Sequence, residues 1–154
     1  MAANILDVCD DVTVALTTAV NDITIPVDRL YLAPYDLATD TSRHVWVFPA
    51  QYQPSPATRG EDEWVYTIGV VVAERYTTAG EPTPAWLDDR VTFSEQKVYQ
   101  PLYDLLRTMR TFGTTRRLWL STAECRLVYD PDKLSEKKLF WSEFRFEVRE
   151  ILDS

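Results

Sequence analysis

Apolar and polar residues follow one another with two different periods along this chain, and the change of period separates helices from strands. From residue 3 to residue 20, apolar side chains recur at steps of three and four, which is the spacing of one face of an α-helix. The row comprises Ile5, Val8, Cys9, Val12, Leu16, Ala19 and Val20. Several β-branched residues lower the helix propensity of this segment, so packing must hold it. The pattern predicts an amino-terminal helix with one buried side.

Three stretches in the first half of the chain have the pattern of β-strands. Residues 23–35 are extended in pattern, and their prolines confine them to a sheet edge or to strand ends. Residues 44–50 are apolar on both faces until Pro49, which predicts a strand that is covered above and below and ends at that proline. Residues 62–76 place an apolar row at the even positions and predict the longest strand.

Two polar stretches interrupt these elements. Residues 51–63 and 77–90 are rich in proline, glycine and polar residues, and they offer little apolar surface to pack. We expect a long loop at each of them, and the first should be the connection of a β-hairpin.

A second helix is predicted after the second of these loops. Apolar residues return to helical spacing between Val91 and Met109. Thr92 and Glu95 match a capping box, which predicts that the helix begins near Thr92. Pro101 lies inside the helix and predicts a kink, because its ring lacks the amide donor and crowds the preceding turn.

The chain closes with a predicted hairpin of two strands, residues 116–130 and 139–151, joined by a polar turn. In the last strand the even positions are largely apolar and the odd positions carry charges of alternating sign, so each kind of residue has its own face. We call the charged positions Glu143, Arg145, Glu147 and Arg149 the charged row. Two interpretations stay open: contact with another copy of the chain, where opposite charges set the register, or pairing across strands of the same sheet.

The order of these elements predicts an α+β fold in a single domain over residues 1–154. We expect a mainly antiparallel sheet of about five strands, with two helices packed on one face. The second faces of the long strands are only half polar, which favours burial against further copies of the chain.

Composition narrows the range of functions. The formal net charge of -8 argues against a surface that binds nucleic-acid phosphates. No apolar run approaches the roughly 20 residues that cross a bilayer, and the first residues lack the pattern of a signal peptide. We therefore expect a protein that is made in the cytoplasm and has no membrane contact.

Residues suited to catalysis or to cofactor binding are few. His44 is the single histidine and stands at the start of an apolar strand, so a structural role is favoured over acid–base catalysis. Cys9 and Cys125 fall in apolar rows, which predicts two buried free thiols. The glycines are isolated, so no phosphate loop or dinucleotide motif can form. We expect no catalytic residue and no cofactor.

Acidic residues crowd one predicted turn, where Asp130, Asp132 and Glu136 could offer oxygen ligands to calcium. Pro131 and the lack of a central glycine break the EF-hand pattern, so a solvated turn is favoured. No metal site is expected, and the chain is predicted not to be an enzyme.

The arrangement of elements resembles that of the tail terminator (tail-completion) proteins of long-tailed bacteriophages. The resemblance covers nearly the whole chain, and it rests on the order, length and pattern of RLYLAPY, HVWVFPA, DEWVYTIGVVVAERY, VYQPLYDLLRTM and LFWSEFRFEVREI. The shared features are a proline-bounded second strand, a third strand that ends in a polar arm, and a final strand reading F-x-F-x-V-R.

The resemblance implies a structural protein of the virion, assembled in the host cytoplasm and placed at the junction of tail and neck. Copies would form a homohexameric ring that caps the tail tube, stops its polymerisation and joins the tail to the head connector or another neck protein. DNA would pass through the ring without specific binding. The charged row is the predicted subunit contact, and Gln53, Arg59, Glu61 and Asp62 are the predicted contacts with axial partners.

Two other functions stay open. A different phage neck component, such as a head-closure or connector protein, would share the size, the acidic balance and the ring. A small α+β enzyme or ligand-binding domain could use carboxylates and tyrosines. The mass in solution separates these classes, because a monomer favours the enzyme or binding domain, and a ring of about six or twelve copies favours the phage proteins.

Overall fold

The computed structural model describes residues 5–20, 27–29, 43–58, 61–108, 111–112 and 116–153. They form a six-stranded sheet with the strand order β1-β2-β3-β6-β5-β4. The strands are β1 (Val27–Arg29), β2 (His44–Thr58), β3 (Glu61–Arg75), β4 (Thr111–Phe112), β5 (Arg116–Leu127) and β6 (Leu139–Asp153). The predicted α+β fold with a mainly antiparallel sheet is confirmed. Where about five strands were expected, there are four long antiparallel strands and short edge strands β1 and β4, of which β1 runs parallel to β2.

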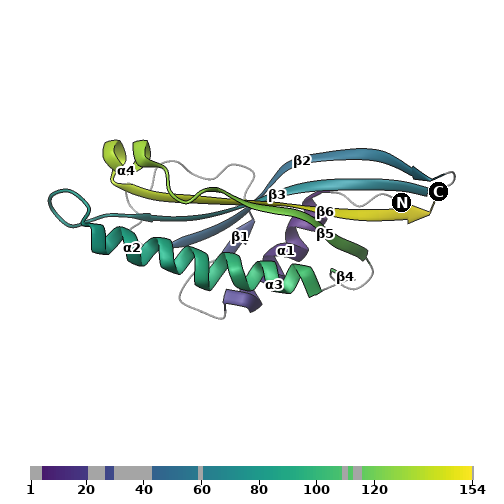
Figure 1. Cartoon of the computed structure of the whole chain (residues 1–154), viewed down its shortest axis with the longest axis horizontal. Coiled ribbons are helices and arrows are strands. Elements are labelled where there is room, and N and C mark those ends of the chain that lie inside the picture. Colours follow the sequence, from purple (N-terminus) through teal and green to yellow (C-terminus); the bar gives the residue numbers. More distant parts are fainter. Residues whose placement is uncertain are drawn as a thin grey trace.

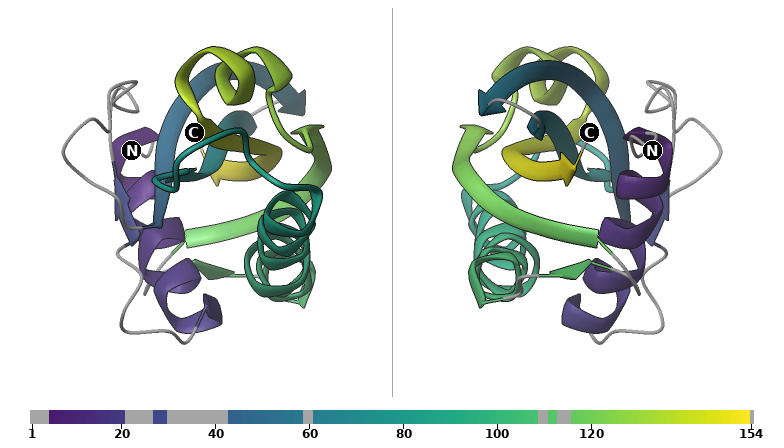
Figure 2. Two further views of the ribbon diagram at one scale, coloured as in Figure 1. Left: turned by 90° about the vertical axis from the view of Figure 1, so that its left-hand side faces the viewer. Right: turned by 90° about the vertical axis from the view of Figure 1, so that its right-hand side faces the viewer.

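The predicted amino-terminal helix is α1 (Ile5–Val20). A second, longer helix consists of α2 (Pro84–Phe93), the π-helical turn η1 (Ser94–Tyr99) and α3 (Gln100–Thr108), and we call it the α2–α3 helix. The short helix α4 (Pro131–Lys137) connects β5 to β6. Figure 2 shows α1 and the α2–α3 helix on one side of the sheet and α4 on the other.

The main core lies between the sheet and the two long helices, on a face that we call the helix face. Along β3 and β6 this face carries the even-numbered side chains, so that Ile68 lies opposite Phe146 and Val70 lies opposite Phe144. The helices contribute the fully buried side chains Val8, Val12, Leu16, Val98, Leu102 and Leu106. The apolar rows predicted for the amino-terminal helix and for the two longest strands are therefore the rows that form the core.

The opposite side of the sheet carries the odd-numbered side chains of β3 and β6, and we call it the open face. Near α4 it holds a small buried cluster of Trp46, Val71, Ala73, Leu139 and Trp141. Lys133 of α4 places its ammonium group 4.8 Å from the centre of the Trp141 ring. α4 thus covers one end of the open face, where β6 begins.

The prediction of a loop over residues 51–63 is wrong, because β2 and β3 continue there as a paired hairpin. A bulge between Pro49 and Gln51 lets the pairing resume after the proline, so Pro49 does not end the strand. β1 pairs with β2 only at residues 45–47, which leaves the rest of β2 as an edge strand among the described residues and explains why it tolerates prolines. We call residues 51–58 and 61–67 the arm.

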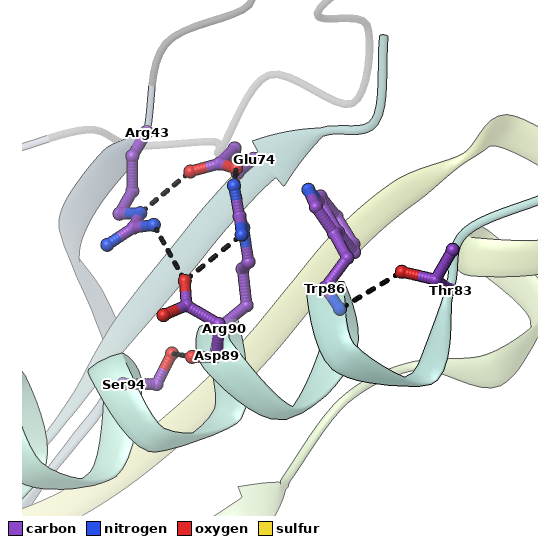
Figure 3. Close-up of polar contacts among 7 residues, drawn as sticks. All are labelled: Arg43, Glu74, Thr83, Trp86, Asp89, Arg90 and Ser94. Atoms are coloured by element: carbon purple, nitrogen blue, oxygen red, sulfur yellow. Dashed lines mark hydrogen bonds and ion pairs between the residues drawn. The ribbon is translucent and has the colours of Figure 1, made fainter. Parts of the chain in front are cut away.

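The loop expected over residues 77–90 is present only up to residue 83, because α2 begins at Pro84. Thr83 caps this helix, and its Oγ1 accepts a hydrogen bond of 3.2 Å from the amide of Trp86 (Figure 3). Proline is favoured in the first turn, because backbone amides there have no acceptor within the helix and the missing amide hydrogen costs no hydrogen bond. The predicted start at Thr92 is therefore wrong, and Thr92 lies inside the helix.

The α2–α3 helix runs through Pro101, where a kink was predicted. Immediately before the proline the helix widens into the π turn η1, and the amide of Gln100 donates to the carbonyl of Glu95, five residues back. A wider turn shifts the preceding carbonyls, which a proline ring would otherwise crowd. The disturbance expected from Pro101 takes the form of this widened turn.

The turn predicted between the last two strands contains α4. Asp130 caps it, because its Oδ1 accepts hydrogen bonds from the amides of Asp132 at 3.0 Å and Lys133 at 3.2 Å. Lys138 ends it in the left-handed conformation, at φ 52°. The Asp130 carboxylate, considered above as a calcium ligand, thus accepts hydrogen bonds from the amino terminus of α4 instead.

We expect Asp130→Ala to lower the free energy of unfolding by about 1 kcal/mol at pH 7. Burial alone would raise the pKa of the Asp130 carboxyl, but hydrogen bonds from Lys133 and Asp132 and the Lys133 charge hold this pKa below its usual value. The carboxylate therefore stabilises the fold above its unfolded pKa, and this contribution is lost as the pH falls through the folded pKa.

Urea denaturation at several pH values measures this effect. The difference between wild type and Asp130→Ala should shrink between about pH 5 and pH 2. Glu136→Ala, at an exposed position of the same helix, is the control and should change the free energy of unfolding by less than about 0.5 kcal/mol. A difference for Asp130→Ala that stays constant over this range would contradict the role of the ionised carboxylate.

Candidate interaction surfaces

The charged row lies along β6 on the open face, beyond the end that α4 covers. Each of its four side chains is half-buried. The placement follows from the strand period, because the neighbouring even positions Phe144, Phe146 and Val148 are buried in the core on the helix face.

Arg149 at one end of the row is bonded to both neighbouring strands. Its Nη1 donates to Glu63 Oε1 of β3 at 2.7 Å, and its Nε donates to Ser121 Oγ of β5 at 3.0 Å. Ser121 lies at a bulge of β5, between Leu120 and Thr122. Arg149 therefore ties three strands together within one chain.

Glu143 at the other end of the row also has partners within the sheet. Its Oε2 lies 3.5 Å from Arg126 Nε on β5 and 3.4 Å from Arg145 Nε on β6. Cross-strand pairing, one of the two interpretations of the row, is thus observed for Arg149 and Glu143. Contact of the row with a second copy stays a prediction.

The two central residues of the row are less well satisfied. The contact of Arg145 Nε with Glu143 does not have hydrogen-bond geometry, so this buried N–H group is without an acceptor in the described part of the chain. The guanidinium carbon of Arg145 lies 5.9 Å from the centre of the Phe48 ring. Glu147 forms no ion pair with any side chain of the described ranges.

A hollow of about 410 Å³ opens on the open face around these central residues. It is lined by polar and charged side chains from all four long strands, among them Gln51, Thr67, Thr122, Glu124, Arg126, Arg145 and Glu147. The mixture of both signs suits a protein surface with matching charges better than a purely anionic or cationic ligand.

The arm carries the predicted contacts with axial partners. Gln53 is exposed on β2, and the neighbouring Tyr52 is 58% exposed while its ring stacks on Trp64 at 6.0 Å. Arg59 lies outside the described residues. Glu61 and Asp62 are the first residues of β3, and their side chains lie outside the described part of the structure.

An apolar groove of about 280 Å³, which sequence reasoning missed, runs between the α2–α3 helix and β5. Its lining includes Tyr99, Tyr103, Cys125, Val128 and Phe144. Cys125 is exposed here, so the prediction that both thiols are buried is wrong for Cys125 and confirmed for Cys9. β4 pairs with β5 only at residues 116 and 117, so β5 has no second neighbouring strand at Cys125 within the described part of the chain.

Tyr99 closes the base of this groove. Its hydroxyl donates to Ser142 Oγ at 2.7 Å, and Ser142 in turn donates to the Leu127 carbonyl at 3.1 Å. Burial raises the pKa of the Tyr99 phenol far above its usual range, so it remains a protonated donor. The chain of hydrogen bonds is structural, since it satisfies polar groups inside the core.

A buried carboxylate fixes α2 to the sheet (Figure 3). Glu74 of β3, with its side chain 10% exposed, accepts from Arg43 Nε at 2.7 Å and from Arg90 Nε at 2.7 Å. Asp89 lies 3.0 Å from Arg90 Nη1 and 3.6 Å from Arg43 Nη2. Phe93 and Trp86 pack against the guanidinium groups of Arg43 and Arg90. We call Arg43, Glu74, Asp89 and Arg90 the ion-pair cluster.

The described residues give little indication of a metal site, of a catalytic histidine or of a membrane-spanning helix. Within the described ranges, no group of three or more His, Cys, Asp or Glu side chains is placed to hold a metal ion. His44 is half-buried and stacks on Trp46 at 5.1 Å between ring centres, as a structural histidine does. None of the described helices is long and apolar enough to cross a membrane.

Comparison with known proteins gives a likeness to solved structures but not to protein sequences. No protein-family model and no curated protein matches the sequence. The fold is similar to a solved chain of the sheath/tube terminator of an extracellular contractile injection system, PVC, in its extended state. The TM-score is 0.40 at 12% identity, over 100% of this chain and 58% of that chain. This chain therefore spans little more than half the length of the terminator, and the activity of the whole terminator is not established for it.

Proposed function

We propose that this chain is a structural subunit of a phage tail or a tail-like particle. In this proposal six copies close into a ring that caps the tail tube, stops its polymerisation and joins the tail to the head connector. The observation that carries it is that β2, β3 and β6 extend past the helices (Figure 1). The arm is therefore left uncovered by the described helices, and the charged row is uncovered because it lies on the open face beyond α4.

Ring closure would explain how such a subunit ends a growing tube. A contact between two different surfaces repeats through a rotation, and a rotation that returns to its start leaves no free end. The chain offers separate exposed surfaces for contact with other chains, namely the open face with its charged row, the arm, and the apolar groove. The charged row is a further surface that we assign to contact between copies, apart from the two different surfaces that close the ring.

The arm is the surface that we assign to axial partners, the tube protein on one side and the connector on the other. It combines an exposed tyrosine, Tyr52, with the polar side chains of Gln51 and Gln53. Amphipathic aromatic residues are enriched at protein interfaces, because they bury a large area and keep a hydrogen-bonding group.

The acidic balance of the chain fits the same role. A net charge of -8 disfavours binding to nucleic-acid phosphates. A ring around the path of the DNA benefits from such a surface, since the DNA must slide through without being retained.

The mass of the purified chain in solution tests ring formation. We expect a ring of six copies, or a pair of such rings, by sedimentation velocity and native mass spectrometry. A chain that stays monomeric at all concentrations would overturn the proposal. It would instead favour a ligand-binding domain that uses the apolar groove.

A tube-polymerisation assay tests the role of the arm. We expect Tyr52→Ala to weaken capping of tubes made from the cognate tube protein by about tenfold or more, because an exposed aromatic residue at an interface contributes strongly to binding. Val14→Ala is the control, since Val14 is an exposed apolar residue on α1 and belongs to none of these surfaces. Equal capping by wild type and Tyr52→Ala, with both proteins folded, would remove the arm from the proposed interface.

A further inference from the structure

We propose that the charged row joins two copies of this chain face to face about a two-fold axis, with Arg145 of each copy paired with Glu147 of the other. The inference rests on the proposed function only in that both require contact between copies. It adds a two-fold contact that is separate from the contact that closes the ring, and it holds for free pairs of chains as well as for pairs of rings.

The order of the charges makes the row complementary to itself. A two-fold axis that lies between two facing sheets, and crosses β6 between Arg145 and Glu147, reverses the direction of the strand. Glu143 of one copy then faces Arg149 of the other, and Arg145 faces Glu147. Each position meets a charge of opposite sign, which is the requirement for an isologous contact. A row with the order Glu-Arg-Arg-Glu would place like charges opposite one another under the same rotation.

Contacts within the chain indicate that the central residues, Arg145 and Glu147, are the part of the row best placed to bind a second copy. Arg149 and Glu143 already have partners on β3 and β5. Arg145 has no hydrogen bond for its Nε, and Glu147 has no ion pair among the described side chains. The two side chains with the fewest polar partners are thus neighbours on one face and carry opposite charges. One two-fold rotation therefore forms two Arg145–Glu147 pairs, each with one residue from each copy.

The strands on either side of β6 fit the same rotation. Arg145 lies beside Gly69 of β3 and Glu124 of β5, and Glu147 lies beside Thr67 and Thr122. Rotation about the axis brings Glu124 opposite Thr122 and Gly69 opposite Thr67. No like charges meet at these positions, and the Phe48 ring, which lies over Gly69, offers an apolar surface to the second sheet there.

Helix α4 limits the extent of this contact. It stands on the open face over Trp141, where β6 begins, so a second copy can approach only over the charged row and the arm. Facing sheets cross at about 30° because each is twisted. The inference requires that this crossing carry the arm of the second copy to one side of α4.

Charge reversal with complementation tests the pairing. Arg145→Glu places like charges at both central contacts, and Glu147→Arg does the same with the opposite sign. Each variant should weaken self-association about tenfold or more, and each should show half the wild-type mass in sedimentation velocity at concentrations where the wild type is paired. An equimolar mixture of the two variants restores opposite charges in the mixed pair, so it should regain the wild-type mass.

Two controls accompany this experiment. Lys97→Glu changes an exposed lysine on the α2–α3 helix and should leave the mass unchanged. The double variant Arg145→Glu/Glu147→Arg keeps the charge of the chain and the complementarity of the row, so it should pair as the wild type does. If a single variant does not fold, the mass of the double variant still tests the pairing, because a double variant that stays unpaired would contradict it.

The outcomes separate this inference from the proposed function. Single variants that keep the wild-type mass, or a mixture that does not regain it, would overturn two-fold pairing. If the variants form single rings while the wild type forms paired rings, both proposals are supported. Identical rings from wild type and single variants would overturn the pairing alone, and a monomeric wild type would overturn both.

Discussion

Replacing Glu74 with glutamine is expected to lower the free energy of unfolding by about 3 kcal/mol, because it leaves two half-buried arginines without their carboxylate. Glu74 is 10% exposed in its side chain, and Arg43 and Arg90 are 20% and 21% exposed. Glutamine keeps the shape and one acceptor oxygen but removes the charge. Urea denaturation followed by circular dichroism measures the change.

Asp89→Asn is the matched control for this experiment. Asp89 contacts the same two arginines, but its side chain is 65% exposed. Exposed ion pairs contribute little because water screens them, so the loss should stay below about 1 kcal/mol. If Glu74→Gln is no more destabilising than Asp89→Asn, burial of the cluster does not hold α2 against the sheet.

Gly69→Ala is expected to destabilise the protein by about 2 kcal/mol, because it overfills a closely packed site. Gly69 lies opposite Phe48 in the β2–β3 pairing, and the Phe48 ring covers it so closely that an added methyl group would overlap the ring. The guanidinium carbon of Arg145 lies 5.9 Å from the centre of the ring, which limits the space into which the ring can move.

A double-mutant cycle with Phe48→Ala shows whether this overlap is the cause. In the Phe48→Ala background, Gly69→Ala should be neutral or slightly stabilising, because the space is empty and alanine loses less backbone entropy than glycine. A full loss that persists without the ring would mean that Gly69 is required for the backbone itself. Thermal or urea unfolding of the four proteins provides the comparison.

The core could be predicted from the sequence because it depends on local periods. The even positions of β3 and β6 form a row of period two, and α1 has a row with helical spacing, so each element shows its buried side in its own sequence. The paired arm could not be predicted, because Pro49 normally ends a strand and only the bulge after it allows β2 to continue. The start of α2 was missed because two threonines nine residues apart both have the chemistry of a cap.

The charged row shows the same division between local and long-range information. That Arg149 and Glu143 share one face follows from the strand period alone. Their partners, Glu63 of β3 and Arg126 of β5, depend on the register between strands distant in the sequence. The apolar groove depends on how the α2–α3 helix lies along β5, and neither segment alone indicates it.

The prolines of β2 have a further consequence for a protein that displays a long, uncovered strand. Pro54 and Pro56 have no amide hydrogen, so the free side of the arm cannot offer a continuous ladder to a foreign strand. Exposed strand edges are a common starting point for aggregation and amyloid growth. The arm can therefore remain accessible at high local concentration, and its side chains instead of its backbone decide which partner it accepts.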